Sequence, residues 1–351
     1  MQLGIYTFGD LDTRPGAARV SPGQRLREIL ERVRLAEEVG LDYAGVGEHH
    51  RPDYAISSPA SVIAAALART ERIHVGSAVT VLSTEDPVRV YQQFATMDQL
   101  SGGRVELLAG RGSFIESFPL FGASLEDYDE LYEEKLDLLL ALDAGNPVTW
   151  SGRFRPPLVD AQVWPRPADK PDLGEHLRIG IATGGSPASS VRAGTVGLPV
   201  NYAVIGGEPR RFAPLVELYR EAFARAGHPA ARRHVSVSVH GFLADDDTTA
   251  LETFYPYQLD AAAKLARERG FAAPTRMSYE MQAGRHGAFV VGSPETVAER
   301  IVTLHGYLGH DRQNFQMDVS GVPQRESLRA IELLGRAKQL VDAELGWPAP
   351  A

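Results

Sequence analysis

The pattern of hydrophobic and polar positions along the 351-residue chain alternates between two kinds of segment. Short runs dense in Ile, Val, Leu, Phe and Tyr predict buried strands at residues 3–8, 43–48, 73–79, 105–109, 178–182, 200–205, 235–242 and 314–319. Longer runs with helical periodicity predict helices at residues 22–39, 59–69, 87–100, 127–143, 187–196, 209–226, 248–269, 294–308 and 324–345. This alternation is typical of parallel strands joined by crossover helices.

Helix-start signals support the same elements. Five predicted helices begin with an N-cap residue followed by proline, at Ser21-Pro22, Ser58-Pro59, Asp86-Pro87, Ser186-Pro187 and Ser293-Pro294. Eight strand–helix units without a break in composition favour one α/β domain over residues 1–351, a (β/α)8 TIM barrel with insertions. An open doubly wound sheet has the same alternation and is the alternative.

Two segments do not follow the repeat. Residues 144–177 are rich in proline, and the stretch 149–154 predicts a small hairpin outside the barrel. Residues 271–292 show no sustained periodicity, which predicts a long structureless loop that acts as a lid or binding loop. Glycines flank Arg285 and His286 in this loop, and we expect these two side chains to reach the substrate; a plain surface linker is the alternative.

Composition excludes several classes of protein. With 44% hydrophobic and 23% charged residues, the chain has the composition of an ordinary globular protein. The net charge of −9 and the lack of a long Lys/Arg run argue against nucleic-acid binding. Because the chain has no cysteine, disulfides, thiolate metal sites, iron–sulfur clusters and cysteine nucleophiles are all excluded. Without a signal-peptide pattern or a long apolar run, we expect a cytoplasmic protein that does not enter a membrane.

The predicted second strand ends in three titratable residues, Glu48, His49 and His50. Active sites of TIM barrels lie at the carboxyl ends of the strands, so these residues are candidates for catalysis. Strand alternation places Glu48 and His50 on one side and His49 on the other. Hydrogen-bonded loop residues are the alternative interpretation. No metal is expected, because adjacent histidines diverge and the fifth and sixth strands end without a histidine.

Two neighbouring strand ends carry features of an anion site. Arg111 lies between two glycines after the fourth strand, where a guanidinium can meet a phosphate. After the fifth strand, Gly185 and Ser186 lead directly into a capped helix that also carries Ser189. We expect free N–H groups, the helix dipole and hydroxyls to meet there. A surface arginine and a capped helix without a ligand are the alternative.

Several segments together resemble a known family. In order they are 47–50, 75–79, 82–89, 97–104, 110–112, 184–186, 197–199 and 291–295. Their order and spacing resemble the bacterial luciferase-like flavin-dependent oxidoreductases over nearly the whole chain. Bacterial luciferase itself has a cysteine where Gly110 stands and an acidic residue where Gly185 stands, so flavin binding is expected here and light emission is not.

The resemblance implies a TIM barrel that binds FMN at the carboxyl ends of its strands. It implies that His49 assists the chemistry of flavin and oxygen, oriented by Glu48 or His50. A non-prolyl cis peptide at Ala78-Val79 would lie beside the isoalloxazine ring. The residues implied for the FMN phosphate are Arg111, Ser113, Gly185, Ser186 and Ser189.

The activity implied is that of a two-component monooxygenase. A separate flavin reductase would transiently supply reduced FMN, and O2 would oxygenate a small organic substrate. The small residues of the helix predicted at 59–69 and the resemblance favour a homodimer. An F420-dependent oxidoreductase is one alternative, although the long anionic tail of F420 needs a broader basic groove than Arg111 and hydroxyls provide. A non-catalytic flavin-binding protein is the other.

Overall fold

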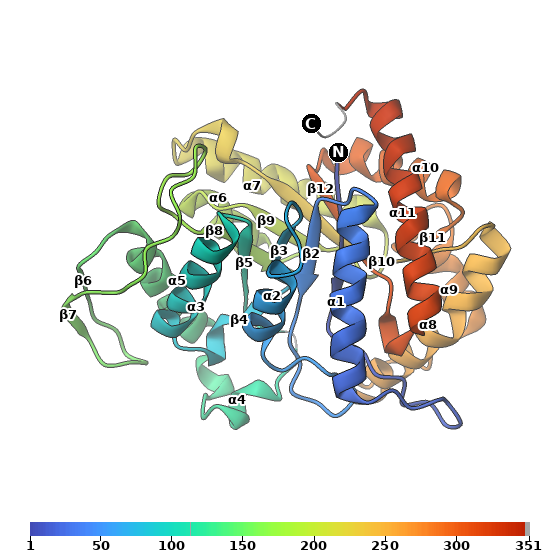
Figure 1. Cartoon of the computed structure of the whole chain (residues 1–351), viewed down its shortest axis with the longest axis horizontal. Helices are drawn as coiled ribbons and strands as arrows, with labels where there is room; N and C mark the ends of the chain where they lie inside the picture. The colour runs from blue at the N-terminus through green and yellow to red at the C-terminus, as the bar shows by residue number, and fades with distance from the viewer. Residues whose placement is uncertain (113, 348–351) are drawn as a thin grey trace.

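The computed structural model describes residues 1–112 and 114–347, and its parallel strands close into a barrel surrounded by helices (Figure 1). Each barrel strand pairs with the next in chain order, and pairing of the last strand with the first closes the ring. The strands are β1 (Gln2–Thr7), β2 (Tyr43–Val46), β3 (His74–Ser77), β5 (Val105–Gly110), β8 (Arg178–Thr183), β9 (Val200–Ala203), β10 (Val235–Leu243) and β12 (Arg312–Gln316). The predicted (β/α)8 TIM barrel is therefore confirmed.

The surrounding helices begin and end close to the predicted bounds. They are α1 (Pro22–Glu38), α2 (Pro59–Leu67), α3 (Pro87–Ser101), α5 (Tyr128–Ala144), α6 (Pro187–Val196), α7 (Ala213–Arg225), α8 (Asp247–Arg269), α10 (Pro294–Leu308) and α11 (Gln324–Leu345). Four of the five predicted N-caps accept a hydrogen bond from their own first turn, and only Ser58 does not. No helix among residues 1–112 and 114–347 is long and apolar enough to cross a membrane.

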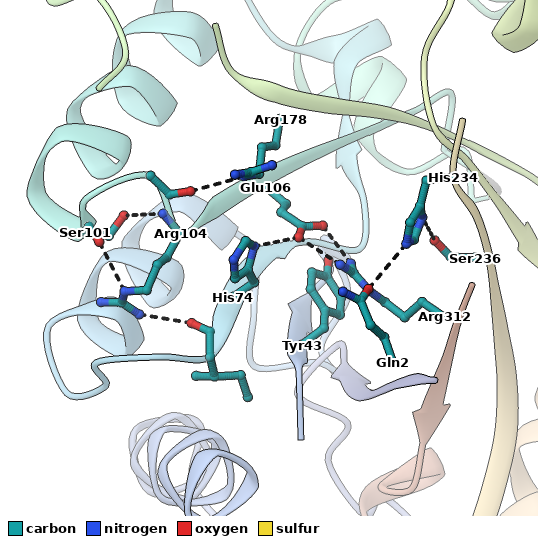
Figure 2. Close-up of polar contacts among 12 residues, drawn as sticks. Gln2, Tyr43, His74, Ser101, Arg104, Glu106, Arg178, His234, Ser236 and Arg312 are labelled. Carbon is teal, nitrogen blue, oxygen red and sulfur yellow. Dashed lines mark hydrogen bonds and ion pairs between the residues drawn. The ribbon is translucent and has the colours of Figure 1, made fainter. Parts of the chain in front are cut away.

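A buried polar network closes the amino end of the barrel (Figure 2). The carboxylate of Glu106 accepts two hydrogen bonds from Arg312, at 2.7 and 3.0 Å, and lies 2.8 Å from Nδ1 of His74. Gln2 accepts a further bond from Arg312 at 2.9 Å. Burial alone would raise the pKa of Glu106, but Arg312 and His74 hold it well below its ordinary value. Charged groups thus satisfy one another at this end of the barrel.

The insertion at residues 144–177 carries its own small sheet. Strands β6 (Val148–Trp150) and β7 (Leu158–Ala161) pair as an antiparallel hairpin that is separate from the barrel sheet (Figure 1). The buried carboxylate of Asp98 in α3 accepts hydrogen bonds from Lys170 Nζ at 2.5 Å and from the Ala168 N–H at 2.8 Å. This contact fixes the end of the insertion against the barrel helices.

The prediction of a structureless loop at residues 271–292 is wrong. The segment contains helix α9 (Arg276–Ala283) and strand β11 (Val290–Gly292), which extends the sheet beside β10. A reciprocal capping box between Thr275 and Ser278 starts α9. Tyr279 is buried and donates a hydrogen bond to the Leu251 carbonyl of α8. An eight-residue helix that buries two side chains is too short for its periodicity to stand out in the sequence.

Candidate active site

The loops that follow β1, β2 and β5 meet at the carboxyl end of the barrel, where their aromatic residues surround His49. The turn after β2 depends on Gly47, because a Cβ there would lie 2.4 Å from the Phe8 ring and 2.6 Å from the Ala78 carbonyl. This close approach brings the chain after β2 against Phe8 of the β1 loop. The glycine thus places residues 48–50 at the mouth of the barrel.

His49 is 9% exposed and lies among three aromatic rings. Its ring centroid is 4.6 Å from Phe8, 4.4 Å from Tyr54 and 4.5 Å from Phe114. Its Nδ1 atom lies 3.4 Å from Oε1 of Glu116, and no residue among those described contacts Nε2 through a hydrogen bond. The ring is therefore held on one edge, and its second nitrogen is available to a ligand.

Glu48 and His50 lie together on the other side of the chain, as strand alternation predicts. Glu48 is buried; its Oε1 accepts a hydrogen bond from the Val81 N–H at 2.5 Å, and its Oε2 lies 3.4 Å from Nε2 of His50. The hydrogen bond with Glu48 outweighs burial and raises the pKa of His50 above its ordinary value. The pair braces the loop after β2 against the segment after β3.

The residue that contacts Nδ1 of His49 is Glu116, whereas we expected Glu48 or His50 to orient the ring. Burial would raise the pKa of Glu116, but the hydrogen bond with His49 and a backbone bond bring it below its ordinary value. Sequence analysis missed Glu116 because 67 residues separate it from His49. Its position six residues after the end of β5, in the same loop as Arg111, was the available signal.

The Ala78-Val79 peptide bond is cis, as the resemblance implied. It lies between β3 and the short strand β4 (Thr80–Val81). Glycines on both neighbouring strands give it room: a Cβ on Gly45 would lie 2.8 Å from the Ala78 side chain, and a Cβ on Gly110 would lie 2.6 Å from Val79. Close backbone approach from β2 and β5 therefore requires glycine at both positions.

The predicted phosphate-binding residues lie at the ends of two paired strands. β5 and β8 are hydrogen-bonded neighbours; Arg111 directly follows β5, and Gly185 lies two residues after the end of β8. Arg111 donates to Asp129 at 2.5 Å and lies 5.3 Å above the Tyr128 ring, so the first turn of α5 positions its guanidinium. Ser113 lies outside the described residues.

The start of α6 differs from the prediction in one respect. The N–H groups of Gly185 and Ser186 are not free, because both donate to the Thr183 hydroxyl at 3.2 Å. The Ser186 hydroxyl accepts from the N–H of Ser189, also as a cap. A Cβ on Gly184 would meet nothing within 4 Å, so the turn is open beside these hydroxyls. A guanidinium, hydroxyls and open backbone at adjacent strand ends fit a phosphate group.

Arg285 and His286 are not brought to this site. They line a separate cavity with Arg210, Arg300 and Tyr307, between α10 and the turn before α7. The Arg285 side chain is 75% exposed and lies 3.7 Å from Glu299 of α10. No contact among the described residues joins either side chain to His49 or Arg111. Because α9 and β11 fold this segment against α8 and β10, its glycine-flanked turn faces α10.

Metal ligation finds no support in the described part of the chain, which contains no group of three or more His, Cys, Asp or Glu side chains that could hold a metal ion. Sequence analysis also missed the rings of Phe8, Tyr54 and Phe114, which come from three different loops. Single aromatic residues in loops carry no periodic signal, so only the closed barrel brings them together.

Comparison with known proteins gives a consistent family. A family model described as luciferase-like monooxygenase matches residues 1–311. The alkanal monooxygenase alpha chain of Photobacterium leiognathi is 36% identical over 124 residues, which cover 34% of this chain and 35% of that protein. An F420-dependent glucose-6-phosphate dehydrogenase of Kribbella flavida is 28% identical over 264 residues, which cover 73% and 72% of the two chains.

Solved structures share the whole fold. The monooxygenase RslO1 from Streptomyces bottropensis superposes with a TM-score of 0.80 at 26% identity, covering 96% of this chain and 98% of that one. The oxygenating constituent of 3,6-diketocamphane monooxygenase from Pseudomonas putida, solved with FMN, superposes with a TM-score of 0.73 at 20% identity and covers 95% and 96% of the two chains. An F420-dependent secondary alcohol dehydrogenase superposes at 0.72 with 18% identity over 96% and 98%.

Proposed function

Because this chain belongs to the luciferase-like monooxygenase family, we propose that it is an FMN-dependent monooxygenase that oxygenates a small organic substrate. Reduced flavin would come from a separate reductase, and O2 would be the oxidant. The observation that carries the proposal is His49, a histidine at the barrel mouth with one nitrogen held by Glu116 and the other facing no protein partner. Redox work belongs to a bound flavin, and the protein supplies position, a dry site and a proton.

The residues of this chain fit FMN at two places. Arg111 and the hydroxyls of Ser186 and Ser189 would hold the phosphate, since they lie at adjacent strand ends beside an open glycine turn. Ala78 and Val79 would lie beside the ring system. Bound FMN supplies the electrons that activate O2. One structural neighbour was solved in complex with FMN, which supports this choice of cofactor.

His49 would hold or release a proton at Nε2 during the reaction. Glu116 would fix the ring orientation through Nδ1, since a base that is oriented by a third group keeps one tautomer available. The rings of Phe8, Tyr54 and Phe114 would exclude water from this proton. Glu48 and His50 would brace the loop without touching the reaction.

The alternative is an F420-dependent oxidoreductase. Two of the similar proteins named above depend on F420, which favours this alternative. Thermal unfolding with equal concentrations of FMN and F420 separates the two, because a ligand that binds only the folded state raises the melting temperature. A larger shift with FMN supports the proposal, and a larger shift with F420 overturns it.

Reaction with oxygen then tests for a monooxygenase. Reduced FMN and the protein are mixed with O2 in a stopped-flow instrument, and flavin oxidation is compared with that of free reduced FMN. We expect the protein to change the rate and time course of oxidation. FMN binding with an unchanged time course would instead support a non-catalytic flavin-binding protein.

A further inference from the structure

A charged cleft opens beside the candidate active site, where the loops after β1 and β2 face the last turns of α8. Its volume is about 460 Å³, which is in the range of sites for small organic molecules. Arg51 and Asp53 of the β2 loop line one side, Thr13 lies at one end, and Lys264, Arg267 and Glu268 of α8 line the other side. No residue assigned above to flavin binding lines it.

One aromatic ring separates this cleft from His49. The guanidinium of Arg51 lies 5.1 Å above the Phe114 ring, and Phe114 packs edge-on against His49 at 4.5 Å between centroids. Tyr54, from the same loop as Arg51, contacts His49 at 4.4 Å. Arg51 and His49 therefore contact the same Phe114 ring, so a single side chain links the cleft to His49.

One cation that lines the cleft has no carboxylate partner in the described part of the chain. Arg51 contacts Glu268 at 2.5 Å and Asp53 at 3.3 Å, while Lys264 contacts Asp53 at 3.6 Å and Asp260 at 3.0 Å. Arg267 is exposed and has no hydrogen-bond or ion-pair partner among the described residues. The carboxylates of Asp53, Asp260 and Glu268 all contact Arg51 or Lys264, so the guanidinium of Arg267 is left without a carboxylate partner among these residues.

The contact with Glu268 shows that the guanidinium of Arg51 binds a carboxylate. The Glu268 side chain is 36% exposed and belongs to the last turn of α8, yet its carboxylate contacts the guanidinium of Arg51 inside the cleft. The planar guanidinium of arginine matches the geometry of a carboxylate. A carboxylate from solution can take the place of Glu268 on Arg51, because an exposed glutamate at a helix end can turn back to water at little cost.

We propose that this cleft is an anion subsite for the substrate, which carries a carboxylate on an apolar, ring-containing body. Arg51 and Arg267 bind the carboxylate in place of Glu268, and the apolar body lies on Phe114 and Tyr54 beside His49. The assignment of this ligand as the substrate rests on the proposed function. The binding of a carboxylate does not, since it requires neither flavin nor oxygen.

Calorimetric titration of the flavin-free protein with phenylacetate and its neutral analogue phenylacetamide tests the subsite. We expect phenylacetate to bind at least about tenfold more tightly, which corresponds to about 1.4 kcal/mol. Arg51→Gln and Arg267→Gln should each weaken phenylacetate binding about fivefold or more and leave phenylacetamide binding unchanged. Glu268→Gln should tighten phenylacetate binding several-fold, because it removes the competing carboxylate.

The matched control is Arg329→Gln, which removes another partly exposed arginine paired with acidic residues, on α11. It should leave both affinities unchanged. The proposal is overturned by equal affinity for the two probes, by no saturable binding of phenylacetate, or by weaker binding in Glu268→Gln. Thermal unfolding of each variant verifies that it is folded.

A repeat of the titration with saturating FMN separates this inference from the proposed function. Retained phenylacetate binding supports a subsite for the substrate. If FMN displaces phenylacetate, the cleft serves the cofactor and the inference is wrong. If FMN itself fails to bind, the proposed function fails, whereas the phenylacetate titration still decides whether the cleft binds anions.

Discussion

Replacement of Glu116 by glutamine should slow oxygen-dependent turnover while FMN affinity holds. The side chain keeps its shape in Glu116→Gln, but the negative charge that faces Nδ1 of His49 is lost. Glutamine can present either an oxygen or an NH2 group to the imidazole, so the ring is no longer held in one tautomer and orientation. The variant therefore changes the positioning of His49 and leaves Nε2 chemically intact.

The size of the effect follows from the geometry of the pair. A hydrogen bond to a charged group contributes about 1.5–3 kcal/mol. The two atoms are 3.4 Å apart and the Glu116 side chain is 22% exposed, which places this pair at the lower end of that range. A loss of about 1.5–2 kcal/mol of transition-state stabilisation corresponds to a rate decrease of about 10- to 30-fold.

Single-turnover measurements provide the assay, with reduced FMN prebound and O2 added across a pH series. Flavin titration gives the FMN affinity of each variant, and thermal unfolding gives its stability. Glu126→Gln serves as the control, because Glu126 is exposed in the same β5–α5 connection. The pH dependence of turnover should shift in Glu116→Gln and not in the control. Unchanged turnover, or a loss matched by weaker FMN binding, would refute a positioning role.

Four further predictions follow from the same geometry. Arg111→Ala should weaken FMN binding more than about tenfold by equilibrium titration, because a charge-assisted phosphate contact is lost; unchanged affinity would remove Arg111 from the site. His49→Ala should slow single turnover about a hundredfold or more at nearly unchanged FMN affinity, and full activity would make His49 structural. Burial lowers the pKa of His310 to about 3. Its contribution to stability is therefore complete above about pH 6.5 and falls toward pH 3, because the unfolded chain takes up the proton first. In urea unfolding at pH 7.5 and 4.5, His310→Gln should lose less unfolding free energy on acidification than the wild-type protein. Thr275→Ala removes the cap of α9 and should lower the free energy of unfolding by about 1 kcal/mol in urea unfolding; an unchanged free energy would show that the cap does not stabilise the segment.

Local sequence signals were sufficient for the elements of the barrel. Strand and helix positions follow from hydrophobic periodicity, and serine or aspartate before proline located the starts of five helices. Alternation along the strand also predicted that Glu48 and His50 lie on one side and His49 on the other. These features depend on residues that are close together in the chain, so they can be predicted from the sequence alone.

The residues of the candidate site could be predicted only in part from local sequence signals. Arg111 and Ser186 were predicted because glycines and a helix cap mark these strand ends. The N–H groups of Gly185 and Ser186, which we expected to be free, instead donate to the Thr183 hydroxyl. A side-chain hydroxyl that accepts hydrogen bonds from its own loop produces no pattern in residue spacing, so the sequence did not predict this contact. The glycine-flanked Arg285 carried a similar local signal, but a short helix and an added strand turned it toward α10.

The sequence by itself determined the strand–helix alternation and the approximate bounds of the elements. Only the tertiary structure decided that Glu116 orients His49, that rings from three loops surround it, and that Arg51 lies one ring away. The physical reason is that hydrogen-bond and hydrophobic periodicity act between near neighbours in the chain. Contacts between loops depend on which strand ends become adjacent when the barrel closes.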